Sequence, residues 1–195
     1  HPIDASYGEL DYKARQIAQR LRAMGAPGDR VLIMHKQGID FITSFLGCAY
    51  AQMIAVPIMP PINQEVASKL ALVIENAKPI ACLTSQEIYS RLSKLKIMGR
   101  LEKHRLLSPL VHKMGGNILQ KFEPLIAANI FSLNWVITDA KNLGQAELFH
   151  LPVIDPQSPL FLQYTSGSTG NPKGVIVTQE NVLHNIECIR YGLNI

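Results

Sequence analysis

Cysteine and histidine are scarce in this 195-residue sequence, and neither forms a pattern typical of a metal site. The three cysteines, Cys48, Cys82 and Cys188, are widely separated in apolar segments and form no C-x-x-C pair, so we expect no disulfide framework and no zinc site. The six histidines lack H-x-x-x-H and H-E-x-x-H spacing, which argues against a histidine-based metal site. We therefore expect a reducing, cytoplasmic setting.

A targeting segment and a membrane span are also lacking. The first residues contain no basic region followed by an apolar stretch, so we expect no signal peptide, and the absence of an initiator Met indicates a trimmed start. One uncharged run, residues 41–62, is long enough to cross a bilayer. Pro57, Pro60 and Pro61 interrupt it, so we predict a buried helix followed by a buried strand and no transmembrane segment.

Composition is typical of one globular domain, with 47% hydrophobic and 17% charged residues. The net charge of +4 is unevenly spread, because residues 91–121 hold eight Lys or Arg and only one acid, Glu102. We find no internal repeat, no low-complexity tract and no inter-domain linker.

Alternating apolar patterns predict an α/β fold. Short apolar runs typical of strands buried on both faces occur at 31–34, 54–59, 79–83, 135–138, 160–164 and 175–178. Helical spacing occurs at 10–21, 39–49, 66–74, from about 85, and at 182–189. This order predicts a mainly parallel sheet flanked by helices, with a basic, leucine-rich elaboration at about 91–132.

The stretch "YTSGSTGNPKG", residues 164–174, is rich in glycine and hydroxyl groups. Composition alone is typical of a flexible linker. However, the stretch joins two predicted buried strands, so its backbone N–H groups and hydroxyls would converge on one small volume. Lys173 adds a cation suited to polyphosphate. We therefore interpret the stretch as a phosphate-binding loop.

The loop differs from the common nucleotide P-loop. That motif places Gly-Lys-Ser/Thr at the start of a helix. Here Lys173 follows Pro172, which has no N–H group, and precedes Gly174 and a predicted strand. The spacing therefore excludes a Walker-type kinase or GTPase.

The same eleven residues resemble the phosphate-binding signature of the acyl-adenylate-forming (AMP-binding) superfamily. "SYGELDYKARQIAQRL" is similar to the opening helix of that superfamily. "GDRVLIMHKQGIDFITSFLGCAYAQMIAVPIMPP", "FLQYTSGSTG" and "VLHN" resemble its fatty acyl-AMP ligase branch. The resemblance covers most of the sequence except residues 91–132, although Gln179 stands where many members have His.

The resemblance implies an ATP-dependent acid ligase. Such a ligase forms an acyl adenylate and pyrophosphate from a fatty or other carboxylic acid, and then transfers the acyl group to an acyl carrier protein. It also implies that a set of loop residues holds the β- and γ-phosphates, with Mg²⁺ bridging: Thr165, Ser166, Gly167, Ser168, Thr169, Gly170 and Lys173. We assign no catalytic residue and no metal ligand in the protein.

The family's adenine, ribose and catalytic lysine segments would follow Ile195, so residues 1–195 are expected to be the N-terminal part of an AMP-binding domain. We expect the chain alone to bind ATP weakly and to be inactive. Two alternatives stay open: a fragment of an acyl-CoA synthetase, and a non-catalytic interaction module with a vestigial phosphate loop.

The basic stretch has two interpretations. Leu92, Leu95, Met98 and Leu101 have helical spacing among cations, which favours a solvated helix that covers the sheet. The alternative is a docking surface for an acidic partner, such as an acyl carrier protein or an anionic membrane surface. Nucleic acid is not expected, since no aromatic residues alternate with the cations.

Overall fold

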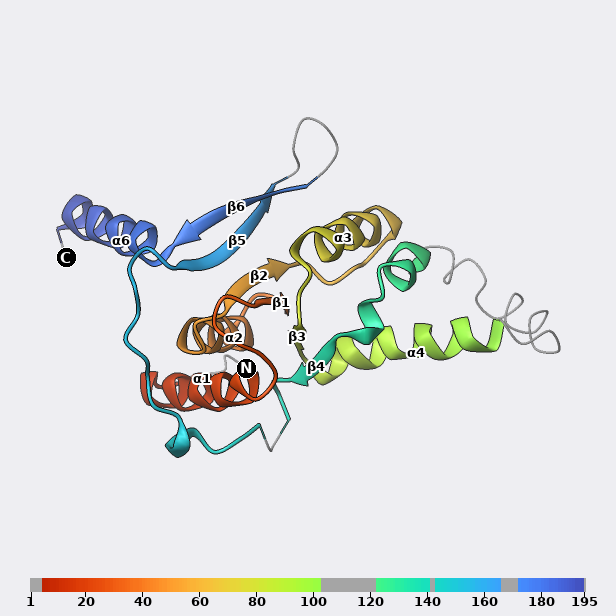
Figure 1. The fold of residues 1–195 in the computed structure, drawn as a ribbon, viewed down its shortest axis with the longest axis horizontal. Helices are drawn as coiled ribbons and strands as arrows, with labels where there is room; N and C mark the ends of the chain where they lie inside the picture. The colour runs from red at the N-terminus through yellow and green to blue at the C-terminus, as the bar shows by residue number, and fades with distance from the viewer. Residues whose placement is uncertain (1–4, 103–121, 141–142, 166–171, 195) are drawn as a thin grey trace.

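A six-stranded sheet organises the fold (Figure 1). The structure is a computed structural model, and it describes residues 5–102, 122–140, 143–165 and 172–194. The strand order is β4-β3-β1-β2-β5-β6. The strands are β1 (Arg30–Met34), β2 (Ile54–Ile58), β3 (Ala81–Thr84), β4 (Asn134–Ile137), β5 (Pro159–Thr165) and β6 (Lys173–Thr178).

Most of the sheet is parallel, as the sequence predicts. β1 pairs in parallel with β2 and β3, and β4 continues the parallel sheet beyond β3. β5 pairs in parallel with β2 only where Phe161 lies opposite Ala55. β6 is antiparallel to β5, so the last two strands form a hairpin at one edge.

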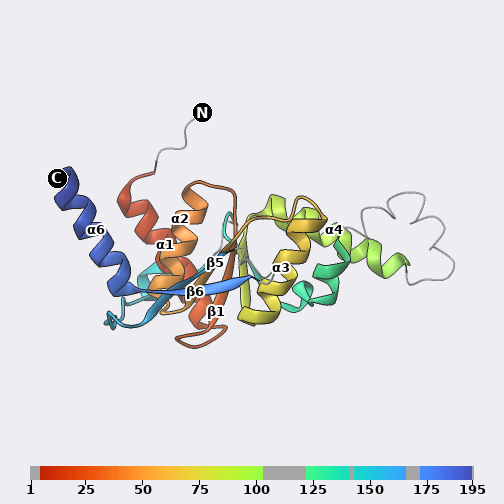
Figure 2. The same cartoon turned by 90° about the horizontal axis from the view of Figure 1, so that it is seen from above.

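Helices cover both faces of the sheet (Figure 2). Alternate residues of a strand point to opposite faces. Val31 and Ile33 of β1 accordingly contact one apolar cluster, and Leu32 and Met34 contact a second. The helices α1 (Tyr7–Arg22) and α2 (Ile39–Tyr50) supply the first cluster, while α3 (Gln64–Ala77) and α4 (Gln86–Glu102) supply the second. The prediction of a sheet flanked by helices is therefore confirmed.

Helix starts follow local sequence signals. Ser6 accepts a hydrogen bond from the Glu9 amide and the Glu9 carboxylate accepts one from the Ser6 amide, which forms a capping box for α1. Asn63 caps α3 in a similar way, through the Val66 amide. Shorter 3₁₀ turns occur at η1 (Ile130–Ser132) and η2 (Ala146–Leu148).

The end of the chain departs from the prediction that its strands are buried on both faces. In β6 the residues from Lys173 to Ile176 are exposed, and no residue of this edge strand belongs to either apolar cluster. The helix that follows, α6 (Gln179–Leu193), contains no buried residue. Figure 1 shows this helix beside the hairpin, at the end of the molecule opposite α4.

The described part of the basic stretch continues the helix α4. Ile88 and Leu92 of α4 are buried in the second cluster, while Arg91 and Lys94 are exposed. Arg91 forms an ion pair with Glu87 at 2.7 Å. Residues 103–121 lie outside the described part of the chain.

No helix in the described ranges is long and apolar enough to span a bilayer. The uncharged run at 41–62 forms most of α2 and all of β2 instead, which matches the predicted helix followed by a strand.

Candidate phosphate-binding site

The hairpin of β5 and β6 carries the two ends of the predicted phosphate loop. Thr165, the last residue of β5, is the cross-strand partner of Lys173, the first residue of β6. Both residues are exposed, and partners of this kind project from the same face of a hairpin. The side chains of Thr165 and Lys173 therefore leave the same face at the end of the hairpin. The other predicted loop residues lie outside the described part: Ser166, Gly167, Ser168, Thr169 and Gly170.

The preceding pair of residues lies on the opposite face of the hairpin. Tyr164 is the cross-strand partner of Gly174, and a Cβ atom on Gly174 would lie 3.0 Å from Cζ of Tyr164. The Tyr164 ring thus covers the backbone of β6 at close range. Its hydroxyl donates a hydrogen bond to Oδ1 of Asn76 in α3, at 2.6 Å. The hairpin is therefore tied to a helix at the point where the loop begins.

A buried histidine that sequence reasoning did not select lies where β1 and β4 end. His35 follows β1, and its Nε2 atom lies 3.0 Å from Oγ of Ser44 and 3.3 Å from Oγ1 of Thr138. Burial lowers the pKa of His35, while nearby Asp40 raises it to a smaller extent. The sequence signal that could have identified His35 is its place as a polar residue directly after the apolar strand β1. Its partners could not be found from spacing, because Thr138 is 103 residues away.

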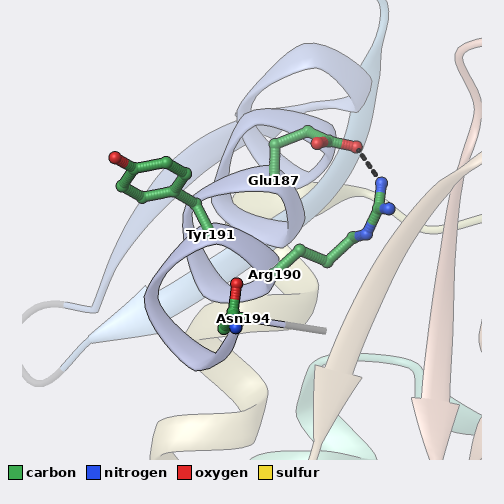
Figure 3. A pocket seen from close by; sticks show the side chains of 4 residues that line it. All are labelled: Glu187, Arg190, Tyr191 and Asn194. Carbon is green, nitrogen blue, oxygen red and sulfur yellow. Dashed lines mark hydrogen bonds and ion pairs between the residues drawn. The ribbon is translucent and has the colours of Figure 1, made fainter.

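Metal ligands do not gather near the hairpin in the part of the chain that the structure describes. Within the described ranges, no three His, Cys, Asp or Glu side chains group together as metal ligands would. An open pocket lies on the last turns of α6, where Arg190 pairs with Glu187 at 3.0 Å and Tyr191 and Asn194 complete the lining (Figure 3). Neither Thr165 nor Lys173 lines this pocket.

The relatives found by comparison with known proteins include ligases of fatty acids. The chain is 29% identical to the medium-chain-fatty-acid:acyl-carrier-protein ligase JamA of Moorena producens, over 95% of the chain and 27% of that protein. It resembles the crystal structure of a fatty acid AMP ligase from Legionella pneumophila, with a TM-score of 0.72 and 30% identity over 98% of the chain and 28% of the ligase.

A further structure from L. pneumophila is similar to the same extent. It is a fatty acyl-adenylate ligase in complex with acyl adenylate and pyrophosphate, with a TM-score of 0.69 and 31% identity over 96% of the chain and 27% of the ligase. The chain thus spans about 27% of the length of the curated relatives it matches. The profile of the AMP-binding enzyme family matches residues 2–194. The chain therefore belongs to the AMP-binding enzyme family.

Proposed function

We propose that this chain is part of an ATP-dependent fatty acid ligase and holds the phosphates of ATP at the end of the β5–β6 hairpin. The observation that carries the proposal is the exposed pair of Thr165 and Lys173, which flanks a Gly-, Ser- and Thr-rich loop in a member of the AMP-binding family. We further propose that residues 1–195 are the N-terminal part of the AMP-binding domain.

The proposed first step joins the acid to AMP. A carboxylate oxygen attacks the α-phosphorus of ATP, the bond to the β-phosphate oxygen breaks, and pyrophosphate leaves with the negative charge. The carboxylate is already ionised at neutral pH, so this step needs no general base. The ammonium group of Lys173 and the loop hydroxyls, by donating hydrogen bonds, would stabilise the charge that develops on the departing pyrophosphate. Each charge-assisted hydrogen bond would contribute about 1.5 to 3 kcal/mol.

The residues present also fit Mg²⁺ that arrives with ATP. Magnesium usually keeps several waters and binds through substrate phosphates with few protein ligands, so it does not need a cluster of carboxylates. The hydroxyls of Thr165, Ser166, Ser168 and Thr169 are the oxygen donors that the proposed loop offers. Bound Mg²⁺ would neutralise part of the phosphate charge.

The second step we propose is acyl transfer to an acyl carrier protein. The thiol of the carrier attacks the acyl carbon, a thioester forms, AMP leaves and one proton is released. JamA, whose name includes this acceptor, supports the choice of carrier protein over coenzyme A. The relative with bound acyl adenylate and pyrophosphate supports the first step.

Binding of Mg·ATP by the 195-residue chain tests the proposal. We expect weak, saturable binding, and we expect Lys173→Ala to reduce the affinity about tenfold or more because a charge-assisted contact is lost. Lys69→Ala is the matched control, since Lys69 is an exposed lysine of α3 that pairs with Glu65. Equal affinities in all three proteins, or no binding at all, would contradict the proposal and favour an interaction module with a vestigial loop.

A further inference from the structure

We propose that Tyr164 is a positioning residue: it fixes Thr165 and Lys173 in place by joining the hairpin to the last turn of α3. This inference rests on the proposed phosphate-binding function. It concerns the described residues on both sides of the loop, and it assigns a role to Asn76, which lies 88 residues from Tyr164 in the sequence.

The last turn of α3 is itself held to the sheet. Arg30, the first residue of β1, donates hydrogen bonds from Nε to the carbonyl oxygen of Ala77 at 2.7 Å and from Nη2 to that of Lys78 at 3.2 Å. Lys78 ends the helix in a left-handed conformation, with φ of 47°. Arg30 thus binds carbonyl groups that the end of the helix leaves unpaired. The helix backbone at Asn76, one residue before Ala77, is therefore held against β1.

The hydroxyl of Tyr164 reaches Oδ1 of Asn76. Its ring is half-buried and packs against the apolar cluster between the sheet and α3, and its hydroxyl donates to Asn76 at 2.6 Å. Burial raises the pKa of the Tyr164 hydroxyl, although the charge of Arg30 opposes the shift. The hydroxyl therefore remains a protonated donor at neutral pH.

Backbone pairing attaches β5 to the rest of the sheet at one registered pair, Phe161 with Ala55 of β2. Beyond Phe161, β5 pairs with β6, and its contacts with the body of the fold include the side chains of Leu162 and Tyr164, which pack against the second apolar cluster. Tyr164 contacts both strands of the hairpin, since its ring lies against Gly174. The side chain of Tyr164 therefore joins β5, β6 and α3 at the cross-strand pair next to Thr165 and Lys173.

Without this hydrogen bond, Thr165 and Lys173 are still present, but their positions vary relative to α3. Phosphate binding must then also fix these positions, and the conformational entropy lost in doing so weakens binding. We expect Tyr164→Phe and Asn76→Ala each to weaken binding of Mg·ATP by about threefold to tenfold, the effect of one hydrogen bond. Because both changes remove the same bond, the double variant should bind no more weakly than the weaker single variant.

Tyr50→Phe is the matched control. It removes another tyrosine hydroxyl that bonds across elements, from Tyr50 to Oδ1 of Asp11 at 2.9 Å, and should leave the affinity for Mg·ATP unchanged. Affinities are measured at a temperature at which circular dichroism shows that every variant is folded. If the variants only destabilised the fold, the losses of affinity in Tyr164→Phe and Asn76→Ala would add in the double variant.

The outcomes separate the two proposals. If the unchanged chain binds Mg·ATP and Lys173→Ala weakens binding while Tyr164→Phe does not, the anchoring role is wrong and the phosphate-binding proposal stands. Additive losses in the double variant would also overturn the anchoring role. If the unchanged chain does not bind Mg·ATP, both proposals fail.

Discussion

His35 is a buried titratable side chain in the middle of the fold, where β1, α2 and the segment after β4 meet. Its Nε2 atom lies within hydrogen-bond distance of both Ser44 and Thr138. Burial lowers its pKa below the ordinary value of 6.5; Asp40 and Asp139 oppose the shift, and Lys13 adds to it. The folded state thus holds a neutral imidazole, and protonation would introduce a charge into a buried site.

This shift predicts a loss of stability in mild acid. The unfolded state binds a proton near pH 6.5, and the folded state binds it only at lower pH, so the stabilisation is complete above pH 6.5 and decreases as the pH falls toward the folded pKa. Urea unfolding at pH 7.5 and 5.5 should show a loss of stability at the lower pH that His35→Gln removes. His150→Gln changes an exposed histidine and should preserve the loss. An identical pH dependence for His35→Gln and the unchanged chain would contradict the prediction.

Functional residues could be recognised from the sequence only where the residues that act together are close in the chain. The loop at 164–174 could be recognised because its glycines, hydroxyls and lysine are adjacent in the sequence. Thr165 and Lys173 then proved to be cross-strand partners, which fits the predicted loop between two strands. Asn76 and His35 carry no comparable local signal, because their partners come from other elements.

At the scale of elements, apolar pattern identified the strands but not the position of each in the sheet. β3 and β6 are both short and apolar, yet every residue of β3 is buried while most of β6 is exposed. The difference lies in what covers the two strands: β3, between β1 and β4, contributes residues to both apolar clusters, whereas β6, an edge strand beside β5, contributes none. Strand order depends on contacts between distant segments, which periodicity does not encode.

Packing of α1 against α2 requires a glycine. A Cβ atom at Gly47 would lie 2.5 Å from Cγ2 of Ile17 and 3.3 Å from the carbonyl oxygen of Ala14, so the two helices approach too closely for a side chain. Gly47→Ala should lower the free energy of unfolding by about 1 to 3 kcal/mol, measured by urea denaturation.

Gly192→Ala provides the comparison for that measurement. Gly192 also lies in a helix, but nothing lies within 4 Å of the position of its Cβ atom, so alanine should be neutral or stabilising by up to about 1 kcal/mol. Equal stability of Gly47→Ala and the unchanged chain would show that the helices do not pack as closely as described.

At the scale of the whole molecule, apolar side chains gather on α6 without being buried. Leu183, Ile186 and Ile189 are 58%, 46% and 50% exposed, and they have the spacing of one helical face. They match the helical pattern expected from the sequence, but this face contributes little to the two apolar clusters around the sheet.

We therefore expect substitutions on this face to be tolerated in the 195-residue chain. Leu183→Gln and Ile186→Gln should change the free energy of unfolding by no more than about 0.5 kcal/mol. Leu70→Ala, which truncates a side chain of α3 that is only 4% exposed, should cost about 2 to 5 kcal/mol. A loss above about 2 kcal/mol for either α6 variant would mean that the helix is packed in solution.

The central claim is that the chain binds the phosphates of ATP at the end of the β5–β6 hairpin. Its most direct test is an NMR titration of the ¹⁵N-labelled chain with Mg·ATP, in which each backbone amide reports its own change of environment. We expect the largest shifts at residues 164–174 and at Asn76, which accepts a hydrogen bond from Tyr164. No shift at high nucleotide concentration, or shifts confined to another surface such as the pocket of Glu187 and Arg190, would contradict it.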